Sequence, residues 1–493
     1  MKAGPLALLT TAQMYAADRA AMAGGVSSLD LMEAAGRAVA EAIRRRWSPR
    51  PVLVLAGPGN NGGDGYVAAR LLSQAGWPVT IAVLTPPETL KGDAAAMAAR
   101  WTGPVIGIGD IGWDEVGLVI DALFGSGLSK PVEGAARAAL QAAEARGLPI
   151  VAIDVPSGVS GDSGAVLGYA PQAALTVSFF RAKPGHLLLP GRDLCGTAEI
   201  APIAIPDNVL DEIKPSCWHN GPALWLDSLP VPRGETHKYH RGHALILGGP
   251  MTGAGRLAAQ AARRIGAGLV SLAVPPGTAA IYAADHPGAI VLECPDRAAL
   301  ADILRDPRRN ALLVGPGAGS GPEVGESVAA MLATGRFCVL DAEAISAFAD
   351  DAEALAGLIQ GPCVLTPHEG EFTRLFPDIE GDRLARAREA ARRLGAVLVL
   401  KGSDTVIAAP DGKAAINDNA PADLATAGSG DVLAGLVLGL LAQRMPAFEA
   451  ACAAVWLHGA AAGTASAGLI AEDIPDRLPG LLQRLRRNPV AGF

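Results

Sequence analysis

The chain has 493 residues, of which half are hydrophobic and only 18% are charged. This length is too great for a single hydrophobic core, and the composition excludes a disordered protein, so we expect two or three well-packed domains. The formal net charge of -8 at pH 7, without a strong lysine or arginine run, argues against a nucleic-acid-binding surface.

Six cysteines lie far apart in the sequence, with neither a C-x-x-C pair nor the spacing of a zinc site. In a chain of this length they indicate reduced thiols, and we expect a soluble cytoplasmic protein. The longest apolar stretch, Val432 to Ala442, is much shorter than a membrane span. The N-terminal apolar run, Leu6 to Leu9, is too short for a secretory signal peptide.

The first half of the chain alternates between helical and strand patterns. Helices are expected over residues 1–46, and short apolar runs predict strands at 52–56, 79–84, 118–122 and 150–155. Between these strands, a helix begins at 67–72, and further helical stretches lie at 92–100 and 134–146. Such alternation predicts a Rossmann-like, doubly wound parallel sheet with its site at the carboxyl ends of the strands.

A proline-rich stretch from Ile205 to Tyr239 interrupts this pattern, and we interpret residues 215–234 as a linker. It separates a domain of residues 1–214 from a second domain of residues 235–493. In the second domain, strand patterns resume at His243 and recur near 269–274, 311–315, 337–341, 362–366 and 397–401. We therefore expect two α/β domains in tandem, without an internal repeat.

The loop Gly57 to Gly65 matches the dinucleotide fingerprint G-x-G-x-x-G, but the next strand ends without the acidic residue that binds ribose. Its two asparagines and its aspartate indicate a polar pocket, although a tight turn that requires glycine explains the pattern too. Asn61, Asp121 and Ser157 present oxygen donors at the same sheet edge. Such donors suit a monovalent or divalent cation better than zinc, and each alone could be a helix cap.

Four motifs in this half, GPGNNGGDGYVAARLL, DALFGSGLSKPV, AIDVPSGVSGDSG and LTVSFFRAKPG, resemble the YjeF N-terminal domain, the NAD(P)H-hydrate epimerase, over residues 10–210. The resemblance implies potassium at Asn61, Asp121 and Ser157, and we expect acid–base work from Asp154. The family commonly has Thr at the position of Ser126 and Arg at that of Lys130. The implied hydrate contacts are Asn60, Asn61, Gly62, Gly63, Asp64, Gly125, Ser126, Gly127, Leu128, Ser129, Lys130, Pro131 and Asp154.

In the second half, the stretch Leu424 to Asp431 combines glycines with small hydroxyl residues at the start of an apolar helix. Its backbone N–H groups and helix dipole favour an anion. Asp431 would repel a bound phosphate, so it is either a general base for a phosphoryl acceptor or a simple helix cap. The chain has no Walker A motif. Further loops that contain glycine, histidine or lysine follow predicted strands, and they begin at Gly248, Gly315, Leu365 and Leu400.

Two histidine patterns have simpler explanations than a metal or catalytic site. His237, His240 and His243 have tempting spacing, but they enter a strand, where side chains three residues apart lie on opposite faces. His458 lies in an alanine-rich helix and is interpreted as a packed or capping residue.

The motifs HKYHRGHALILGG, LTPHEGEF, LKGSDTVI and ATAGSGDVLAG resemble the ribokinase-like NAD(P)H-hydrate dehydratase over residues 235–485. The resemblance implies a magnesium ion and Asp431 in catalysis. The family usually has Gly at the position of Ala427 and Thr at that of Ser429. The implied hydrate contacts are Ala254, Gly317, His368 and Asp431, and the implied nucleotide contacts are Lys401, Gly402, Ser403, Asp404, Thr405 and Gly430.

Together the two resemblances imply a bifunctional repair enzyme for hydrated NADH and NADPH. The first domain would interconvert the R and S hydrates, and the second would dehydrate the S hydrate at the expense of ADP or ATP. A small-molecule kinase of the ribokinase type and a non-catalytic first domain remain alternatives. We expect small-molecule partners and a homo-oligomer, with neither nucleic acid nor membrane.

Overall fold

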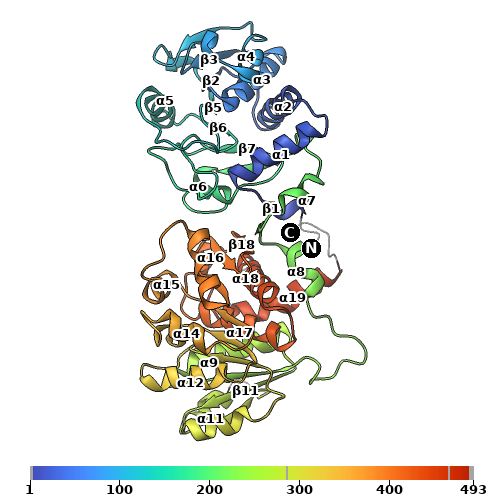
Figure 1. Cartoon of the computed structure of the whole chain (residues 1–493), viewed down its shortest axis with the longest axis vertical. Coiled ribbons are helices and arrows are strands. Elements are labelled where there is room, and N and C mark those ends of the chain that lie inside the picture. The colour runs from blue at the N-terminus through green and yellow to red at the C-terminus, as the bar shows by residue number, and fades with distance from the viewer. Residues whose placement is uncertain (1–3, 285–286, 465–466, 488–493) are drawn as a thin grey trace. The chain divides into compact units, whose positions relative to one another are not determined.

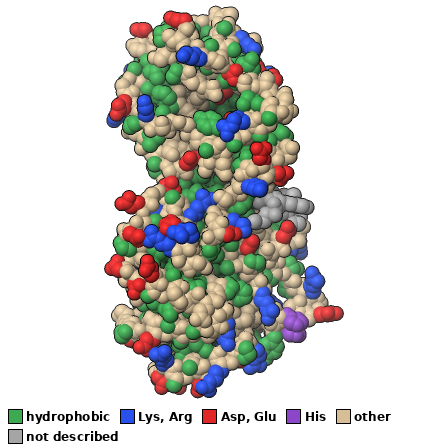
Figure 2. Space-filling model, in the orientation of Figure 1, with side chains coloured by type: hydrophobic (Ala, Val, Ile, Leu, Met, Phe, Trp, Pro, Cys, Tyr) green, Lys and Arg blue, Asp and Glu red, His purple; other side chains and the backbone are tan. Residues whose placement is uncertain are grey.

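The computed structural model describes residues 4–284, 287–464 and 467–487. The chain forms two compact units (Figure 1). Residues 7–217 make the first unit, and the second unit consists mainly of residues from 218 onward. Basic and acidic side chains are interspersed over the face drawn in Figure 2.

The first unit contains a seven-stranded sheet of order β4-β3-β2-β5-β6-β7-β8, in which every neighbouring pair is parallel. The strand order reverses between β2 and β5, so the loops after these two strands diverge and leave a crevice. The doubly wound parallel sheet predicted from the sequence is confirmed. Its strands are β2 (Val52–Ala56), β3 (Val79–Val83), β4 (Val105–Gly107), β5 (Leu118–Ala122), β6 (Ile150–Ile153), β7 (Leu175–Phe179) and β8 (Thr197–Ala201).

Helices cover this sheet, and two of them begin at side-chain caps. Thr10 and Gln13 form a reciprocal capping box at α1, and Ser27 accepts the N–H of Asp30 at α2. The helices are α1 (Thr11–Ala23), α2 (Ser28–Arg46), α3 (Asn60–Gln74), α4 (Gly92–Ala98), α5 (Gly134–Ala145), α6 (Gly191–Leu194) and α7 (Val209–Ile213).

Helix α3 begins at Asn60, seven residues before the start expected from the sequence pattern at Val67. Glycine is unfavourable inside a helix, which explains why the glycine-rich segment was not predicted to be helical. Its packing supplies the compensation. A Cβ on Gly63 would lie 2.5 Å from Sδ of Met32 in α2, so glycine permits the close approach of the two helices.

The second unit has a mixed sheet in which β9-β18-β17-β16-β15-β14-β13-β10-β11-β12 follow one another. The strand pairs from β10 to β16 are parallel, and the pairs β16–β17 and β17–β18 are antiparallel. The order reverses between β10 and β13. Its strands are β9 (Cys217–His219), β10 (His243–Leu247), β11 (Leu269–Val274), β12 (Ile290–Glu293), β13 (Ala311–Val314), β14 (Phe337–Leu340), β15 (Cys363–Leu365), β16 (Val397–Leu400), β17 (Thr405–Ala408) and β18 (Ala414–Asn417).

The helix α17 (Ser429–Ala442) is almost entirely buried and packs along α9 (Thr252–Ile265). It begins at Ser429 rather than at Asp431, because Gly428 takes a left-handed φ of 86° and serves as its N-cap. The other helices are α10 (Ala279–Ala284), α11 (Arg297–Leu304), α12 (Pro322–Leu332), α13 (Glu343–Ser346), α14 (Ala352–Leu358), α15 (Glu369–Leu375), α16 (Arg383–Leu394), α18 (Ala447–Gly463) and α19 (Asp473–Arg487). Within the described parts of the chain, each helix is too short or too polar to cross a bilayer.

The segment interpreted as a linker, residues 215–234, contains β9 and the short helix α8 (Pro222–Trp225). Trp225 is buried, and its ring lies 5.7 Å from that of Trp456 in α18. Asn220 donates to Asn417 in β18 and to the backbone of Cys452. Residues 218–225 are therefore packed into the second unit.

Candidate active sites

A cavity of about 820 Å³ opens in the first unit at the loops that follow β2 and β5, where the strand order reverses. Helices α1 and α2 and the start of α3 form its other walls. Most of the candidate residues of the first domain lie at this cavity. Those that line it are Asn60, Asn61, Asp64, Gly125, Ser126, Gly127, Leu128, Ser129, Lys130 and Asp154.

Asp154 follows β6 and has a left-handed φ of 71°, which is unusual for a residue other than glycine. Its carboxylate accepts hydrogen bonds from the Ser126 N–H at 2.8 Å and the Ser178 hydroxyl at 3.1 Å. Nζ of Lys183, which is buried, lies 2.6 Å from Oδ1. Burial alone would raise the pKa of Asp154, but Lys183 and the hydrogen bonds outweigh it and hold the pKa well below its usual range.

The backbone around Asp154 is held by His186. Nδ1 of this ring accepts the Lys183 N–H at 2.9 Å, so Nε2 carries the proton and donates to the Asp154 carbonyl at 2.8 Å. Burial, together with the Lys183 charge, lowers the pKa of His186 to about 4. The ring is therefore neutral and fixes the strained residue without adding charge.

Asp64, in α3, has a very different environment from Asp154. It is 9% exposed, lines the same cavity and has no hydrogen-bond or ionic partner among the described residues. Burial raises the pKa of Asp64 well above its ordinary value, and the negative charges of Asp154 and Asp18 raise it further.

Asp121 and Ser157 lie together at the ends of neighbouring strands. The fully buried Asp121 carboxylate accepts the Ser157 N–H at 2.8 Å and its hydroxyl at 2.6 Å. Burial raises the pKa of Asp121 to about 6 despite these hydrogen bonds, and no cationic side chain among the described residues pairs with it. Asn61 and Asp154 both approach Gly125: a Cβ on this glycine would be 2.9 Å from Oδ2 of Asp154 and 3.4 Å from Oδ1 of Asn61.

In the second unit, the glycine loops after β10 and β13 are in contact at the point where the strand order reverses. A Cβ on Gly249 would overlap the carbonyl oxygen of Gly317, and one on Gly317 would lie 3.1 Å from Cβ of Ala254. The Tyr282 hydroxyl fixes the first loop, since it accepts the Gly249 N–H and donates to the Gly249 carbonyl. The structure thus brings together Ala254 and Gly317, as the sequence led us to expect.

Two carboxylates, Asp341 and Asp431, act on Lys401, which follows β16 directly. Its ammonium lies 2.8 Å from Oδ1 of Asp341, which also accepts the Thr366 hydroxyl at 2.8 Å. Burial raises the pKa of Asp431 to about 6, the Asp341 charge adds to this effect, and the Lys401 charge opposes it. Lys401 also approaches α17, because a Cβ on Gly430 would lie 3.5 Å from its Nζ.

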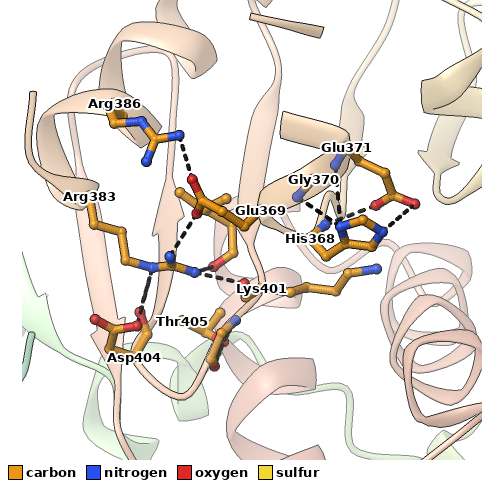
Figure 3. Close-up of polar contacts among 11 residues, drawn as sticks. His368, Glu369, Gly370, Glu371, Arg383, Arg386, Lys401, Asp404 and Thr405 are labelled. Carbon is orange, nitrogen blue, oxygen red and sulfur yellow. Dashed lines mark hydrogen bonds and ion pairs between the residues drawn. The ribbon is translucent and has the colours of Figure 1, made fainter. Parts of the chain in front are cut away.

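His368 is the N-cap of α15 (Figure 3). Its Nδ1 accepts the N–H groups of Gly370 and Glu371, so Nε2 carries the proton and faces Oε1 of Glu371 at 3.4 Å. Its side chain is 55% exposed. The His368 backbone pairs with Lys401 in a parallel bridge, which places the candidate hydrate residue beside the candidate nucleotide turn.

The turn Lys401 to Thr405 is held from α16 by Arg383. Its guanidinium donates to the backbone carbonyls of Leu400, Lys401 and Asp404, while the Lys401 side chain extends in the opposite direction (Figure 3). The Thr405 hydroxyl closes the turn through the N–H and carbonyl of Gly402.

The four histidines that the sequence left without a metal or catalytic role lie apart from these groups or support them. His237 and His240 stack with ring centres 3.4 Å apart in turns before β10, whereas His243 is buried against the Ser271 hydroxyl. His458 is buried in α18, with Nε2 3.3 Å from Oγ of Ser429 at the start of α17. Burial lowers the pKa of His458 to about 4, in agreement with a packed neutral ring.

Comparison with known proteins identifies both halves. Residues 28–185 match the family described as YjeF-related protein N-terminus, and residues 244–483 match NAD(P)H-hydrate dehydratase. A bifunctional NAD(P)H-hydrate repair enzyme of Moorella thermoacetica is 37% identical, with 97% of each chain covered. The chain belongs to this family of bifunctional repair enzymes.

A repair enzyme of Salinibacter ruber is also 37% identical, over 96% of this chain and 95% of the relative. Among solved structures, the ADP/ATP-dependent NAD(P)H-hydrate dehydratase of Bacillus subtilis, co-crystallised with ATP and Mg²⁺, is 32% identical. It covers 54% of this chain and 98% of its own, with a TM-score of 0.49. The present chain has the expected fold class, with a seven-stranded parallel sheet in the first unit and a ribokinase-like mixed sheet in the second.

Two departures of this repair enzyme from its family pattern are accommodated locally. Gly428, and not Ala427, carries the left-handed φ at the start of α17, so alanine causes no backbone strain there. Ser429 retains the hydroxyl of the usual threonine, and this hydroxyl faces His458.

Three charged residues of the repair enzyme's candidate sites were not assigned from the sequence: Lys183, Asp341 and Arg383. Asp341 follows β14 directly, which is the same strand-end signal that identified Asp121. Lys183 lies within the LTVSFFRAKPG motif, but its partner Asp154 is 29 residues away. Arg383 lies inside a helix with many other arginines, and nothing in the sequence distinguishes it.

Proposed function

We propose that this chain repairs hydrated NADH and NADPH, with an epimerase in residues 1–214 and a dehydratase in residues 235–493. Similarity over nearly the full length to bifunctional repair enzymes carries the proposal. The two groups of polar residues, one in each unit, supply chemistry that suits two successive reactions. Residues 215–234 would connect the two activities.

In the dehydratase, Asp431 would accept the proton of the ring hydroxyl as this oxygen attacks the terminal phosphoryl group of ADP or ATP. Phosphate would then leave from the ring as the adjacent ring carbon loses a proton, and this elimination would restore the double bond. A pKa of about 6 leaves Asp431 largely ionised at neutral pH while it remains a useful base. Lys401 and the first N–H groups of α17 are placed to stabilise charge on the phosphoryl group.

Neighbouring loops support the proposed contacts. Ala254, Gly317, His368 and Asp431 would hold the hydrate, since the loops of Ala254 and Gly317 touch and His368 lies beside Lys401. The nucleotide would occupy the turn of Lys401, Gly402, Ser403, Asp404 and Thr405, with Gly430 opposite.

A magnesium ion fits the charge distribution of this second site. Asp341 and Glu343 both raise the pKa of Asp431, so the carboxylates outnumber the single nearby ammonium of Lys401. When bound, Mg²⁺ would neutralise phosphate oxygens. The Bacillus subtilis relative was crystallised with ATP and Mg²⁺. We favour ADP as the donor here, as the resemblance implies.

In the epimerase, the cavity residues and Asp154 would bind the hydrate, and potassium would lie at Asn61, Asp121 and Ser157. The buried Asp121 carboxylate has no cationic side-chain partner among the described residues. Nδ2 of Asn61 is buried without a hydrogen-bond partner. Carboxylate, hydroxyl and amide oxygens suit a hard cation, which would supply the missing positive charge.

Recovery of reduced-nicotinamide absorbance from separated hydrate epimers tests the function. With ADP or ATP, the full chain should restore both epimers. Asp431→Asn should restore neither but still interconvert them, and Asp154→Asn should restore only the S epimer. A stable phosphorylated product would instead identify a kinase. Light scattering would test the proposed homo-oligomer. Cell fractionation would test the proposed cytoplasmic location, which six free cysteines support.

A further inference from the structure

Two carboxyl groups from different elements open into the same cavity, and their environments are opposite. Asp154, after β6, is surrounded by donors: Ser126 N–H, Ser178 hydroxyl and the Lys183 ammonium. Asp64, in α3, is equally enclosed but has no donor among the described residues. A carboxyl group without donors or a cation is stable in a buried site only when it is protonated.

The charged groups around Asp64 reinforce this difference. The charges of Asp154 and of Asp18 in α1 both raise the pKa of Asp64, and burial is the larger effect. Of the cations that line the cavity, Lys183 is bound to Asp154, while Arg19 and Lys130 make no ion pair with Asp64. Burial therefore favours the protonated form of Asp64, while Lys183 holds Asp154 as a carboxylate. Asp18 and Asp93 also line this cavity.

The proposed substrate requires such a pair. Water adds to the reduced ring at the carbon bonded to the ring nitrogen, because the double bond is an enamine. The product is a hemiaminal, whose two epimers differ only at the carbon that carries the hydroxyl. Inversion at this carbon requires cleavage of its C–O bond or its C–N bond.

Resting on the proposed epimerase function, we propose that Asp64 is the general acid of the epimerisation and that Asp154 is its partner base. Asp64 donates its proton to the ring hydroxyl, and the C–O bond breaks with loss of water. The ring nitrogen supplies an electron pair to form an iminium ion, which the Asp154 carboxylate stabilises. A second water attacks the opposite face, forms the new C–O bond and gives a proton to Asp154.

The cycle closes when Asp154 returns its proton to Asp64 through water in the cavity. No oxidant, reductant or further reactant is consumed, and one ring oxygen is exchanged for a solvent oxygen. A weakly basic carboxylate suffices at Asp154, because water that has added to an iminium ion is a strong acid. Asp64 is the more basic of the two groups, which favours the return of the proton.

Inversion in H₂¹⁸O with the full-length protein tests this assignment. We expect each inverted hydrate molecule to carry one ¹⁸O at early times, measured by mass spectrometry after separation of the epimers. Asp64→Asn should lower the kcat of inversion by about 10²-fold or more. Asp64→Glu, which retains an acid, should recover part of the activity, and the exposed Asp114→Asn serves as the matched control.

Asp64→Asn should have the same thermal unfolding midpoint as wild type, because it removes a buried carboxyl group that has no partner. A loss of activity in this variant can then be assigned to chemistry. Inversion that retains ¹⁶O would show C–N cleavage and overturn the proposal, as would an unchanged kcat in Asp64→Asn. If the wild-type protein inverts neither epimer, the proposed epimerase function fails, and this assignment fails with it.

Discussion

Replacement of Lys183 by methionine tests the central ion pair of the first unit. In the wild-type protein its ammonium lies 2.6 Å from Oδ1 of Asp154, with side chains 3% and 15% exposed. Methionine fills a similar volume but leaves a buried carboxylate unpaired. Removal of one partner from a buried pair typically costs about 3–5 kcal/mol, and we expect this loss in the free energy of unfolding.

The surface pair of Lys413 and Asp411 provides the matched control. Its atoms are 2.7 Å apart, but its side chains are 42% and 53% exposed, so Lys413→Met should cost less than about 1 kcal/mol. Hydrogen exchange of β6 and β7 reports the opening free energy of the first unit without interference from the second. Equal losses in the two lysine variants would refute the reasoning.

The pH dependence gives the same test a sign. The folded pKa of Asp154 lies below its unfolded value of about 3.9, so the stabilisation is complete above that value and is lost as the pH falls through the folded pKa. Lys183→Met lacks this stabilisation. The difference from wild type should therefore be largest near neutral pH and should decrease below about pH 4. A difference that grows toward low pH would contradict the assignment.

Three further predictions concern the two sites and the packing of the second unit. The kcat/KM of dehydration should rise with pH through about 6, where Asp431 loses its proton, and Asp431→Asn should lack this rise and be about 10²–10⁴-fold slower. Replacement of potassium by tetramethylammonium should slow inversion in wild type but change Asp121→Asn little. Trp225→Ala should reduce the stability of the second unit by about 3–5 kcal/mol in denaturant titration, because its ring is buried against Trp456. Unchanged profiles or stability would contradict each expectation.

Local signals in the sequence predicted β2, β3, β5 and β6 of the first sheet, β10, β11 and β13 to β16 of the second, and several residues that stand at strand ends. Asp121, Asp154 and Ser157 were recognised because each follows an apolar run, and the carboxyl ends of parallel strands meet at one edge. The strands β7 and β8 received no prediction, although Leu175–Phe179 is fully buried. The β8 run, Thr197–Ala201, is mostly polar or exposed.

Contacts between distant segments could not be predicted in the same way. Lys183 is an ordinary lysine until folding places Asp154 against it, and Asp64 is an ordinary helical acid until burial removes its solvent. The early start of α3 depends on the fit between Gly63 and Met32, which helix propensity does not contain. These features arise from tertiary structure alone.

The hydrogen bonds from Arg383 hold the turn Lys401 to Thr405 rigidly against α16. A loop that had to be ordered on binding would cost about 1–2 kcal/mol per residue in backbone entropy, and this turn is already held in shape. Its backbone therefore acts as a fixed template. If the nucleotide binds at this turn as proposed, adaptation to a different nucleotide would require a shift of the whole helix, and substitutions in the core beneath α16 should change nucleotide selectivity without touching the ligand.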